Sequence, residues 1–189
     1  MTKARDLANG GFGLVLVKPS SVVGGTDNGK GTVSFSGVTS VSLNNVFNST
    51  YTKYRILIDT TLSANDGWYM QLRANGSNAS GAGTYGGQVH RADATSSAAA
   101  RYTATNWDID YTRSAGNLLY EIELFNPFAA SQTYGFSRYT AKLLADTTQM
   151  YHVNQGLTHT PSTSYDGFTM FTGTAVTATG SISVYGYNR

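Results

Sequence analysis

LLYEIELF, residues 118–125, alternates between two sets of side chains. One set is apolar and consists of Leu118, Tyr120, Ile122 and Leu124. The other set contains both charged residues and consists of Leu119, Glu121, Glu123 and Phe125. Side chains of a β-strand point alternately to opposite faces of its sheet, so this stretch predicts a strand with one buried face. YRILID, residues 54–59, repeats the pattern, with Tyr54, Ile56 and Ile58 opposite Arg55, Leu57 and Asp59.

Short strand signals continue on either side of these stretches, separated by clusters of Gly, Asn, Ser and Asp. The predicted strands lie near residues 31–36, 39–47, 53–59, 67–74, 84–91, 101–105, 117–125, 133–143, 149–156, 167–172 and 180–187. No long window has helical spacing, although residues 2–9 and 98–102 could form a helical turn or two. The pattern predicts an all-β protein: an antiparallel β-sandwich, jelly-roll-like, with an extended N-terminal arm.

Residues 1–30 differ in composition from the rest and are expected to form an attachment arm, with the β-sandwich domain at residues 31–189. The arm is Gly-rich and holds a charged patch and one short strand-like run, GLVLVK. We expect this arm to contact an assembly partner. Lys3, Arg5 and Asp6 would make polar contacts, and Leu7, Phe12 and Leu14 would make apolar ones. Fixing each backbone residue costs about 1–2 kcal/mol, so such an arm should order only when it docks. We expect the domain to fold without it.

The composition of the 189 residues favours sheets and excludes several kinds of site. Charged residues make up 13% of the chain, about half the usual share of about 25%, and 13 Tyr stand among abundant Thr, Ser, Asn and Gly. The absence of Cys excludes disulfides and thiolate sites. The apolar run at residues 14–17 is too short for a signal peptide or for membrane insertion.

GGTDNGKGT, residues 24–32, contains most of the G-x-x-x-x-G-K-[ST] pattern of nucleotide-binding loops. Gly31 stands where that pattern needs a magnesium-binding hydroxyl, and an alternating run, TVSFSG, follows where it needs a helix. Asp27, Asn28 and Gly29 are ordinary turn residues. We therefore predict a turn, and no nucleotide or other cofactor.

Two pairs of carboxylates are the strongest candidates for chemistry. Asp108 with Asp110, and Glu121 with Glu123, are two residues apart, so each pair would share one face of a strand. Such pairs can bind a hard cation or work as acid and base, and Asp108 and Asp110 are the metal-site candidates. The alternative is a solvated sheet face whose acids deter edge pairing, and without a calcium-loop motif we favour it.

Catalytic motifs are missing from the sequence. His90, His152 and His159 stand apart without metal-ligand spacing, and no G-x-S-x-G motif marks a nucleophile. These observations predict a protein that is not an enzyme.

Four aromatic residues near predicted strand ends could stack on a glycan: Trp68, Tyr69, Trp107 and Tyr111. The alternative, which is more frequent for large rings, is burial in the core or in a subunit interface. The net charge is +2, and no cluster of Lys and Arg accompanies the rings, so nucleic acid is not an expected partner.

Five strings stand out beyond these motifs: KARDLAN (3–9), GTVSFSGVTSVSLNNVF (31–47), YTKYRILID (51–59), SYDGFTMF (164–171) and TGSISVYGY (179–187). They resemble bacteriophage virion proteins, most closely fibre-type and appendage proteins of phages that infect cyanobacteria and other marine bacteria. The resemblance covers most of the chain in pattern and transfers no catalytic residue. It implies a β-sandwich module at the end of a tail fibre or on a capsid surface, often trimeric.

The function implied by this resemblance is that of a non-enzymatic structural protein of the virion. It would be a short fibre, a knob, a capsid decoration subunit or a tail-fibre module; little precedes the module here, so tail and capsid both stay open. Its expected partners are other capsid or tail proteins, two further copies in a homotrimer, and a host surface glycan. The alternative is a carbohydrate-binding module for a host polysaccharide. Either way, the chain would be made in the host cytoplasm without a signal peptide.

Overall fold

The computed structural model describes residues 13–92, 97–110, 116–142, 150–173 and 176–188. They form two antiparallel sheets, which we call the large sheet and the second sheet. The large sheet has the order β10 (Ser97–Ala104), β9 (Tyr85–Ala92), β14 (Met150–His159), β13 (Thr133–Lys142), β12 (Gly116–Phe125), β6 (Lys53–Leu62), β16 (Ala178–Tyr187), β4 (Thr32–Val38) and β3 (Thr26–Asp27), with β1 (Leu14–Leu16) also beside β16. The second sheet has the order β11 (Trp107–Asp108), β7 (Trp68–Ala74), β15 (Gly167–Thr172), β5 (Ser40–Asn44) and β2 (Ser21–Val23), with β8 (Ser77–Asn78) beside β7.

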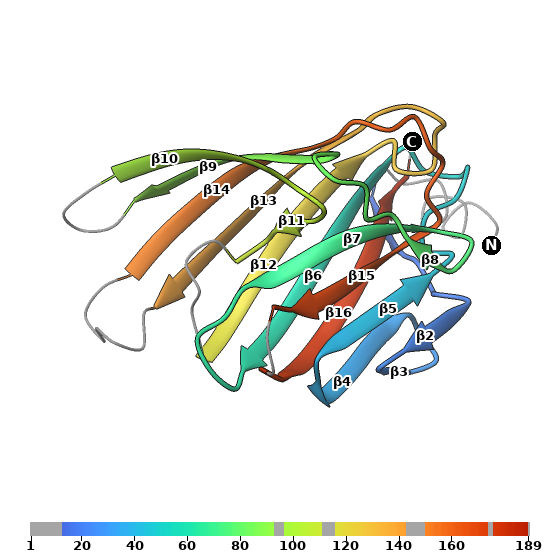
Figure 1. The fold of residues 1–189 in the computed structure, drawn as a ribbon. Coiled ribbons are helices and arrows are strands. Elements are labelled where there is room, and N and C mark those ends of the chain that lie inside the picture. The colour runs from blue at the N-terminus through green and yellow to red at the C-terminus, as the bar shows by residue number, and fades with distance from the viewer. Residues whose placement is uncertain (1–12, 93–96, 111–115, 143–149, 174–175, 189) are drawn as a thin grey trace.

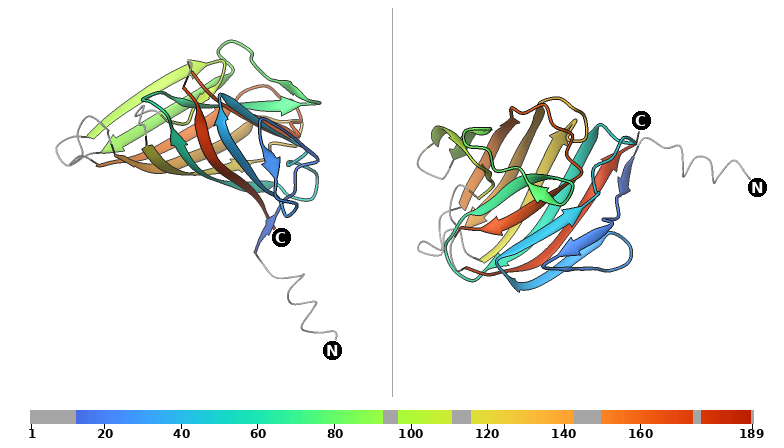
Figure 2. Two further views of the ribbon diagram at one scale, coloured as in Figure 1. Left: turned by 90° about the horizontal axis from the view of Figure 1, so that it is seen from below. Right: turned by 45° about the vertical axis from the view of Figure 1, so that its right-hand side comes forward.

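The two sheets pack face to face, as Figures 1 and 2 show. The predicted antiparallel β-sandwich is therefore confirmed, whereas the jelly-roll connectivity stays a prediction. The layers are unequal: β9, β10 and β14 extend to the left of β7, β15 and β5 in Figure 1. One face of the large sheet packs against the second sheet. We call its other face, which is turned away from the second sheet, the outer face.

The predicted alternation of the two central strands is confirmed. In β6, Tyr54, Ile56 and Ile58 are fully buried toward the second sheet. In β12, Tyr120, Ile122 and their apolar neighbours take the same side, because the register pairs Ile58 with Tyr120 and Ile56 with Ile122. Large side chains therefore fill the space between the layers.

Aromatic contacts join the two layers. The ring of Phe47 lies 4.8 Å from that of Tyr54 and 5.8 Å from that of Phe168 in β15. The hydroxyl of Tyr85 in β9 accepts a hydrogen bond from the backbone N–H of Leu72 (2.9 Å) and donates one to the carbonyl of Ala79 (2.8 Å). A buried tyrosine hydroxyl that is satisfied in this way fixes how the sheets meet.

The start of the domain differs from the expected boundary at residue 31. Residues 14–27 contribute β1 and β3 to the large sheet and β2 to the second sheet. The backbone N–H of Val17 also donates to the carbonyl of Val184 (2.8 Å), and its side chain is buried. The prediction of an arm over residues 1–30 is therefore wrong for residues 14–27. Their backbone groups and the side chain of Val17 complete the sandwich.

Most residues of the expected attachment contacts lie outside the described part of the chain. These are Lys3, Arg5, Asp6, Leu7 and Phe12, together with the helical turn considered for residues 2–9. Leu14 is described, and it lies opposite Tyr187 in the pairing of β1 with β16.

The helical turn considered for residues 98–102 is wrong, because these residues belong to β10. Strand pairing there is fixed by Tyr102, which lies directly opposite Gly87. A Cβ atom at Gly87 would lie 2.2 Å from the tyrosine ring, so the ring covers the glycine. The Tyr102 hydroxyl also accepts a hydrogen bond from the backbone N–H of Asp108 (3.0 Å). This cross-strand packing outweighs the helix propensity of three alanines.

Candidate binding surface

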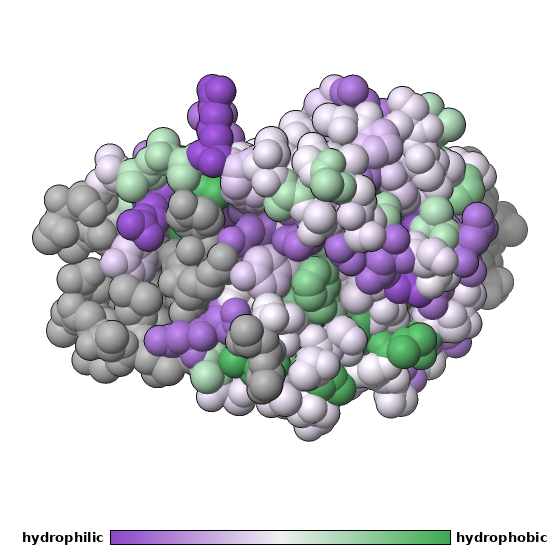
Figure 3. Space-filling view, viewed as in Figure 1, coloured by the Kyte–Doolittle hydropathy of each residue, from purple (hydrophilic) through white to green (hydrophobic). Residues whose placement is uncertain are grey.

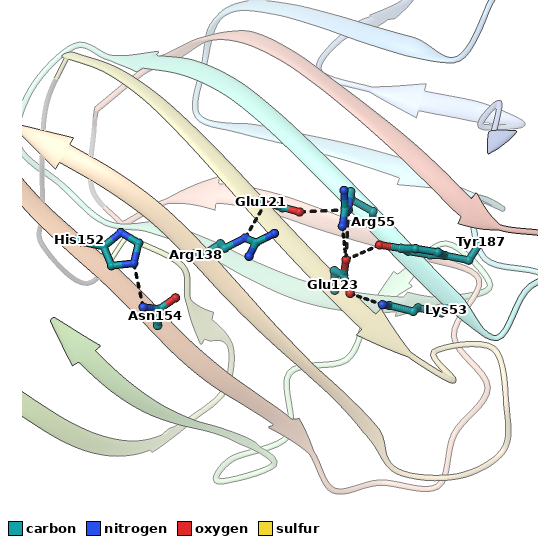
Figure 4. A network of polar contacts seen from close by, with 8 residues as sticks. All are labelled: Lys53, Arg55, Glu121, Glu123, Arg138, His152, Asn154 and Tyr187. Atoms are coloured by element: carbon teal, nitrogen blue, oxygen red, sulfur yellow. Dashed lines mark hydrogen bonds and ion pairs between the residues drawn. The ribbon is translucent and has the colours of Figure 1, made fainter. Parts of the chain in front are cut away.

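The outer face of the large sheet carries a network of five charged side chains, drawn in Figure 4. Glu123 of β12 is at its centre, with Lys53 Nζ 2.5 Å and Arg55 Nη2 2.6 Å from its carboxylate oxygens. The Tyr187 hydroxyl donates a further hydrogen bond to the same carboxylate. Glu121 accepts a hydrogen bond from Arg138 Nε (2.6 Å), and its other carboxylate oxygen forms an ion pair with Arg55 Nε (3.1 Å). The register of β6, β12, β13 and β16 brings these residues together.

The network lowers the pKa of both glutamates. Burial raises the pKa of Glu123, but hydrogen bonds from Lys53, Tyr187 and Arg55 outweigh burial and hold it below its ordinary value. The hydrogen bond from Arg138 is the main cause of the lowered pKa of Glu121. Acid–base catalysis by two carboxylates needs pKa values that are pushed apart. Here both groups are held ionised, which suits structure better than proton transfer.

The expected shared face of Glu121 and Glu123 is confirmed, but the solvated surface favoured for them is wrong for Glu123. Glu123 is only 2% exposed, because Lys53 and Arg55 of the neighbouring strand β6 cover it.

Beside this network lie two neighbouring hollows, of about 630 and about 400 Å³, over strands β10, β9, β14 and β13. They share Gln88 and Gly156, and we call them together the Gly156 trough. Gly156 is exposed, and a Cβ atom placed there would meet no other atom within 4 Å. The trough exists because this strand position has no side chain, while its cross-strand neighbours Phe136 and Gln88 do.

Aromatic and polar side chains surround the trough. Tyr134 is 50% exposed at one end, and the ring of Phe136 packs against Phe125 with 6.1 Å between ring centroids. The basic residues Arg101, His90 and Arg138 line it, and no carboxylate is among the described residues that do. A surface with exposed rings, amides and cations can bind a small or extended polar ligand.

The predicted glycan-stacking residues are not on this surface. Trp68 and Trp107 are fully buried, and Trp107 Nε1 donates to the carbonyl of Thr158 (2.9 Å). The expectation that these two rings are exposed is wrong, and the alternative of core packing is correct for both. Tyr69 is half-buried and stacks on Phe171 at 5.6 Å, and Tyr111 lies outside the described residues.

Asp108 and Asp110 lie at and just beyond the end of the short strand β11. Asp110 is fully buried, so a solvated face is wrong for it. Burial raises the pKa of Tyr120 in β12, and the negative charges of Asp110 and Asp108 raise it further. Within the described ranges, no group of three or more His, Cys, Asp or Glu side chains is placed to hold a metal ion.

Within the stretch at residues 24–32, residues 28–31 connect the antiparallel strands β3 and β4, so the predicted turn is confirmed. Asp27 Oδ1 accepts hydrogen bonds from the backbone N–H groups of Gly29 (3.1 Å) and Gly31 (3.0 Å). Asn28 Oδ1 accepts from Lys30 (2.8 Å). Amides that would face a phosphate in a nucleotide-binding loop are thus used within the turn.

The three histidines lie in different surroundings. His90 and His152 are exposed on the outer face, and His152 Nε2 is 2.9 Å from Asn154 Nδ2 (Figure 4). His159 is buried between the layers, with its Nε2 2.7 Å from the Tyr165 hydroxyl and its ring 4.0 Å from that of Tyr85. Burial lowers the pKa of His159 to about 4, although the Thr84 carbonyl opposes the shift.

The exposed face of the second sheet is polar, as the pale and purple surface over β7, β15 and β5 in Figure 3 shows. Arg73 holds it together: its Nε donates to Asn44 Oδ1 (3.0 Å) and its Nη1 to Thr169 Oγ1 (2.9 Å). Thr169 in turn bonds Ser42 (2.8 Å) and Asn78 (2.8 Å). These side chains satisfy one another, so the outer face of the large sheet is the better candidate for a ligand.

Sequence patterns did not single out Tyr134, Phe136, Arg101, Gln88 or Gly156. The available signal was the alternation of side chains in the strands at 133–143 and 149–156, which places exposed rings next to a glycine once the two strands are aligned.

None of the described residues lies in a helix that could cross a membrane. Comparison of the chain with protein-family models, with curated proteins and with solved structures gives no significant match.

Proposed function

We propose that the chain is a non-enzymatic structural subunit of a bacteriophage particle: a short fibre, knob, capsid decoration subunit or tail-fibre module. The observation that carries this proposal is the resemblance of five strings, from residues 3–9 to residues 179–187, to phage appendage proteins. The antiparallel sandwich is the architecture that this resemblance implies, and the ion-paired state of Glu121 and Glu123 supports a structural role for the carboxylates.

In this proposal the residues before β1 attach the subunit to the particle, and the subunit assembles as a homotrimer. Leu14 and Val15 are each 41% exposed and Val23 is 62% exposed, so apolar side chains lie on the strands that follow the first twelve residues. A neighbouring copy or another capsid or tail protein would cover them. Light scattering on the purified protein should give three times the chain mass of 20.2 kDa. A monomer at micromolar concentration contradicts the trimer.

The experiment for the virion role uses particles of the phage that encodes the chain. Mass spectrometry of purified particles should detect the subunit, and a cryo-EM map should locate its sandwich on the tail or the capsid. A variant without residues 1–12 should keep its melting temperature and be missing from particles. Normal incorporation of that variant contradicts the attachment role, and absence of the full chain from particles contradicts the proposal.

A second candidate function is that of a carbohydrate-binding module that contacts a host polysaccharide. The Gly156 trough favours it, because the exposed ring of Tyr134 and the amides of Gln88 and Asn154 surround an open floor on the sheet. The virion and glycan-binding functions are compatible, since a particle subunit can also contact the host.

A further inference from the structure

We propose that the Gly156 trough binds an extended acidic glycan, a polysaccharide with uronic acid residues. This inference deepens the proposed function, because it names the ligand class for the face that would contact the host. The proposed binding site lies on the outer face of the large sheet and contains none of the four aromatic residues predicted from the sequence to stack on a glycan.

The shape of the trough fits an extended chain better than a compact ligand. Its two hollows follow one another across β10, β9, β14 and β13, and each has the volume of an ordinary small-ligand site. Four neighbouring strands span roughly 14 Å, given a spacing of about 4.8 Å between strands. Several sugar residues can lie end to end over that width.

The floor and ends of the trough fit a sugar ring. Gly156 leaves open space above the backbone, and Thr158, whose side chain lies over Gly86, lines the same hollow. The half-exposed ring of Tyr134 offers an apolar face, and a pyranose ring has an apolar C–H face of its own. Gln88 and Thr103 can hydrogen-bond sugar hydroxyls, since neither side chain has a hydrogen bond within the described part of the chain.

The charges around the trough select an acidic ligand. Arg101 is exposed and forms no ion pair with the described residues, so its guanidinium is available for bidentate binding of a carboxylate. His90 and Arg138 line the second hollow, and the negative charge of Glu121 is already paired with Arg55 and Arg138. An anionic chain would therefore meet the Arg101 guanidinium, and none of the described residues that line the trough is a carboxylate.

Calorimetry with tetragalacturonate, which has one carboxylate on each sugar, tests the ligand class. Maltotetraose is the neutral probe of the same length. We expect the acidic probe to bind at least about tenfold more tightly, and to weaken as NaCl rises from about 50 to about 500 mM, as expected for charge pairing near a surface. Arg101→Gln should bring the two affinities toward equality. Equal binding of both probes by the natural sequence overturns the acidic class.

A second variant tests whether the glycan binds in the Gly156 trough. Gly156→Leu fills the floor and meets no other atom at its Cβ, so it should fold normally and lose binding by about tenfold or more. Thr61→Leu makes a similar change at an exposed position of β6, away from the trough, and should bind as the natural sequence does. Unchanged binding by Gly156→Leu overturns the site, as does tighter binding of a single-stranded oligodeoxynucleotide than of tetragalacturonate.

The inference and the proposed function fail separately. No binding of tetragalacturonate at millimolar concentration overturns the inference, even when the subunit is present in particles. Binding by a chain that is missing from particles leaves the inference standing and contradicts the virion role.

Discussion

Lowering the pH from 7 to 5 should destabilise the protein through His159. Its pKa is about 4 in the folded protein because the ring is buried, whereas an unperturbed histidine has a pKa of about 6.5. Between these values the unfolded chain binds a proton that the folded protein does not. The free energy of unfolding is therefore highest above pH 6.5 and falls as the pH drops from 6.5 toward 4.

The size of the effect follows from the two pKa values. At pH 5 the loss is about 2 kcal/mol relative to pH 7, because the histidine of the unfolded chain (pKa about 6.5) is then mostly protonated and that of the folded protein (pKa about 4) is not. In a domain of this length, each kcal/mol moves the melting temperature by roughly 2–4 °C, so a fall of about 4–8 °C is expected.

Urea unfolding at pH 7 and at pH 5 measures the loss, with tryptophan fluorescence as the signal, since Trp107 lies 6.2 Å from His159. His159→Gln should be less stable at pH 7, but its stability should change by about 2 kcal/mol less between the two pH values. His152→Gln, at an exposed position, is the matched control and should keep the full pH dependence. If His159→Gln and the natural sequence lose the same stability between pH 7 and pH 5, burial of His159 is not the cause of the pH dependence.

Three further predictions concern the network, the N-terminus and the turn. Glu123→Gln should lower the free energy of unfolding, measured in urea, by about 2–4 kcal/mol, because two partly buried cations lose their partner. Glu121→Gln should lower it by about 1 kcal/mol or less, and equal losses for the two variants would contradict this. Deleting residues 1–24 removes β1, β2 and buried Val17, so the melting temperature should fall by at least several degrees, and an unchanged value contradicts our description of the domain. Mg-ATP should leave the melting temperature unchanged, whereas a ligand at a hundred times its dissociation constant would add about 2.7 kcal/mol.

The sequence predicted the strands well where they are long and alternate. Residues 54–59 and 118–125 were placed with the correct buried face, because a period of two is set by backbone geometry alone. Strands of two or three residues, such as β2, β3 and β11, have too few side chains to show a period. They form because longer neighbours offer a pairing edge.

The candidate site was not predictable, because it depends on which strands are neighbours. Tyr134, Gly156 and Arg101 come from three separate segments, and only the register of β13, β14, β9 and β10 places them around one hollow. The same reason explains the wrong interpretation of Glu123: its cations come from β6, more than sixty residues earlier in the chain. Spacing along the sequence shows the face on which a side chain lies but not its neighbours on that face.

The central position of β16 has a consequence for how the protein is made. This strand lies between β6 on one side and β4 and β1 on the other, so these three strands are not joined in one sheet until residues 178–187 exist. At a synthesis rate of about 5–20 residues per second, roughly 10–35 seconds pass before that strand is translated. During this time the edges of β6 and β4 are open to other nascent chains. Folding of the large sheet should therefore be largely post-translational, and its yield in the cell should depend on chaperones and temperature more than that of a protein whose strands pair in order of synthesis.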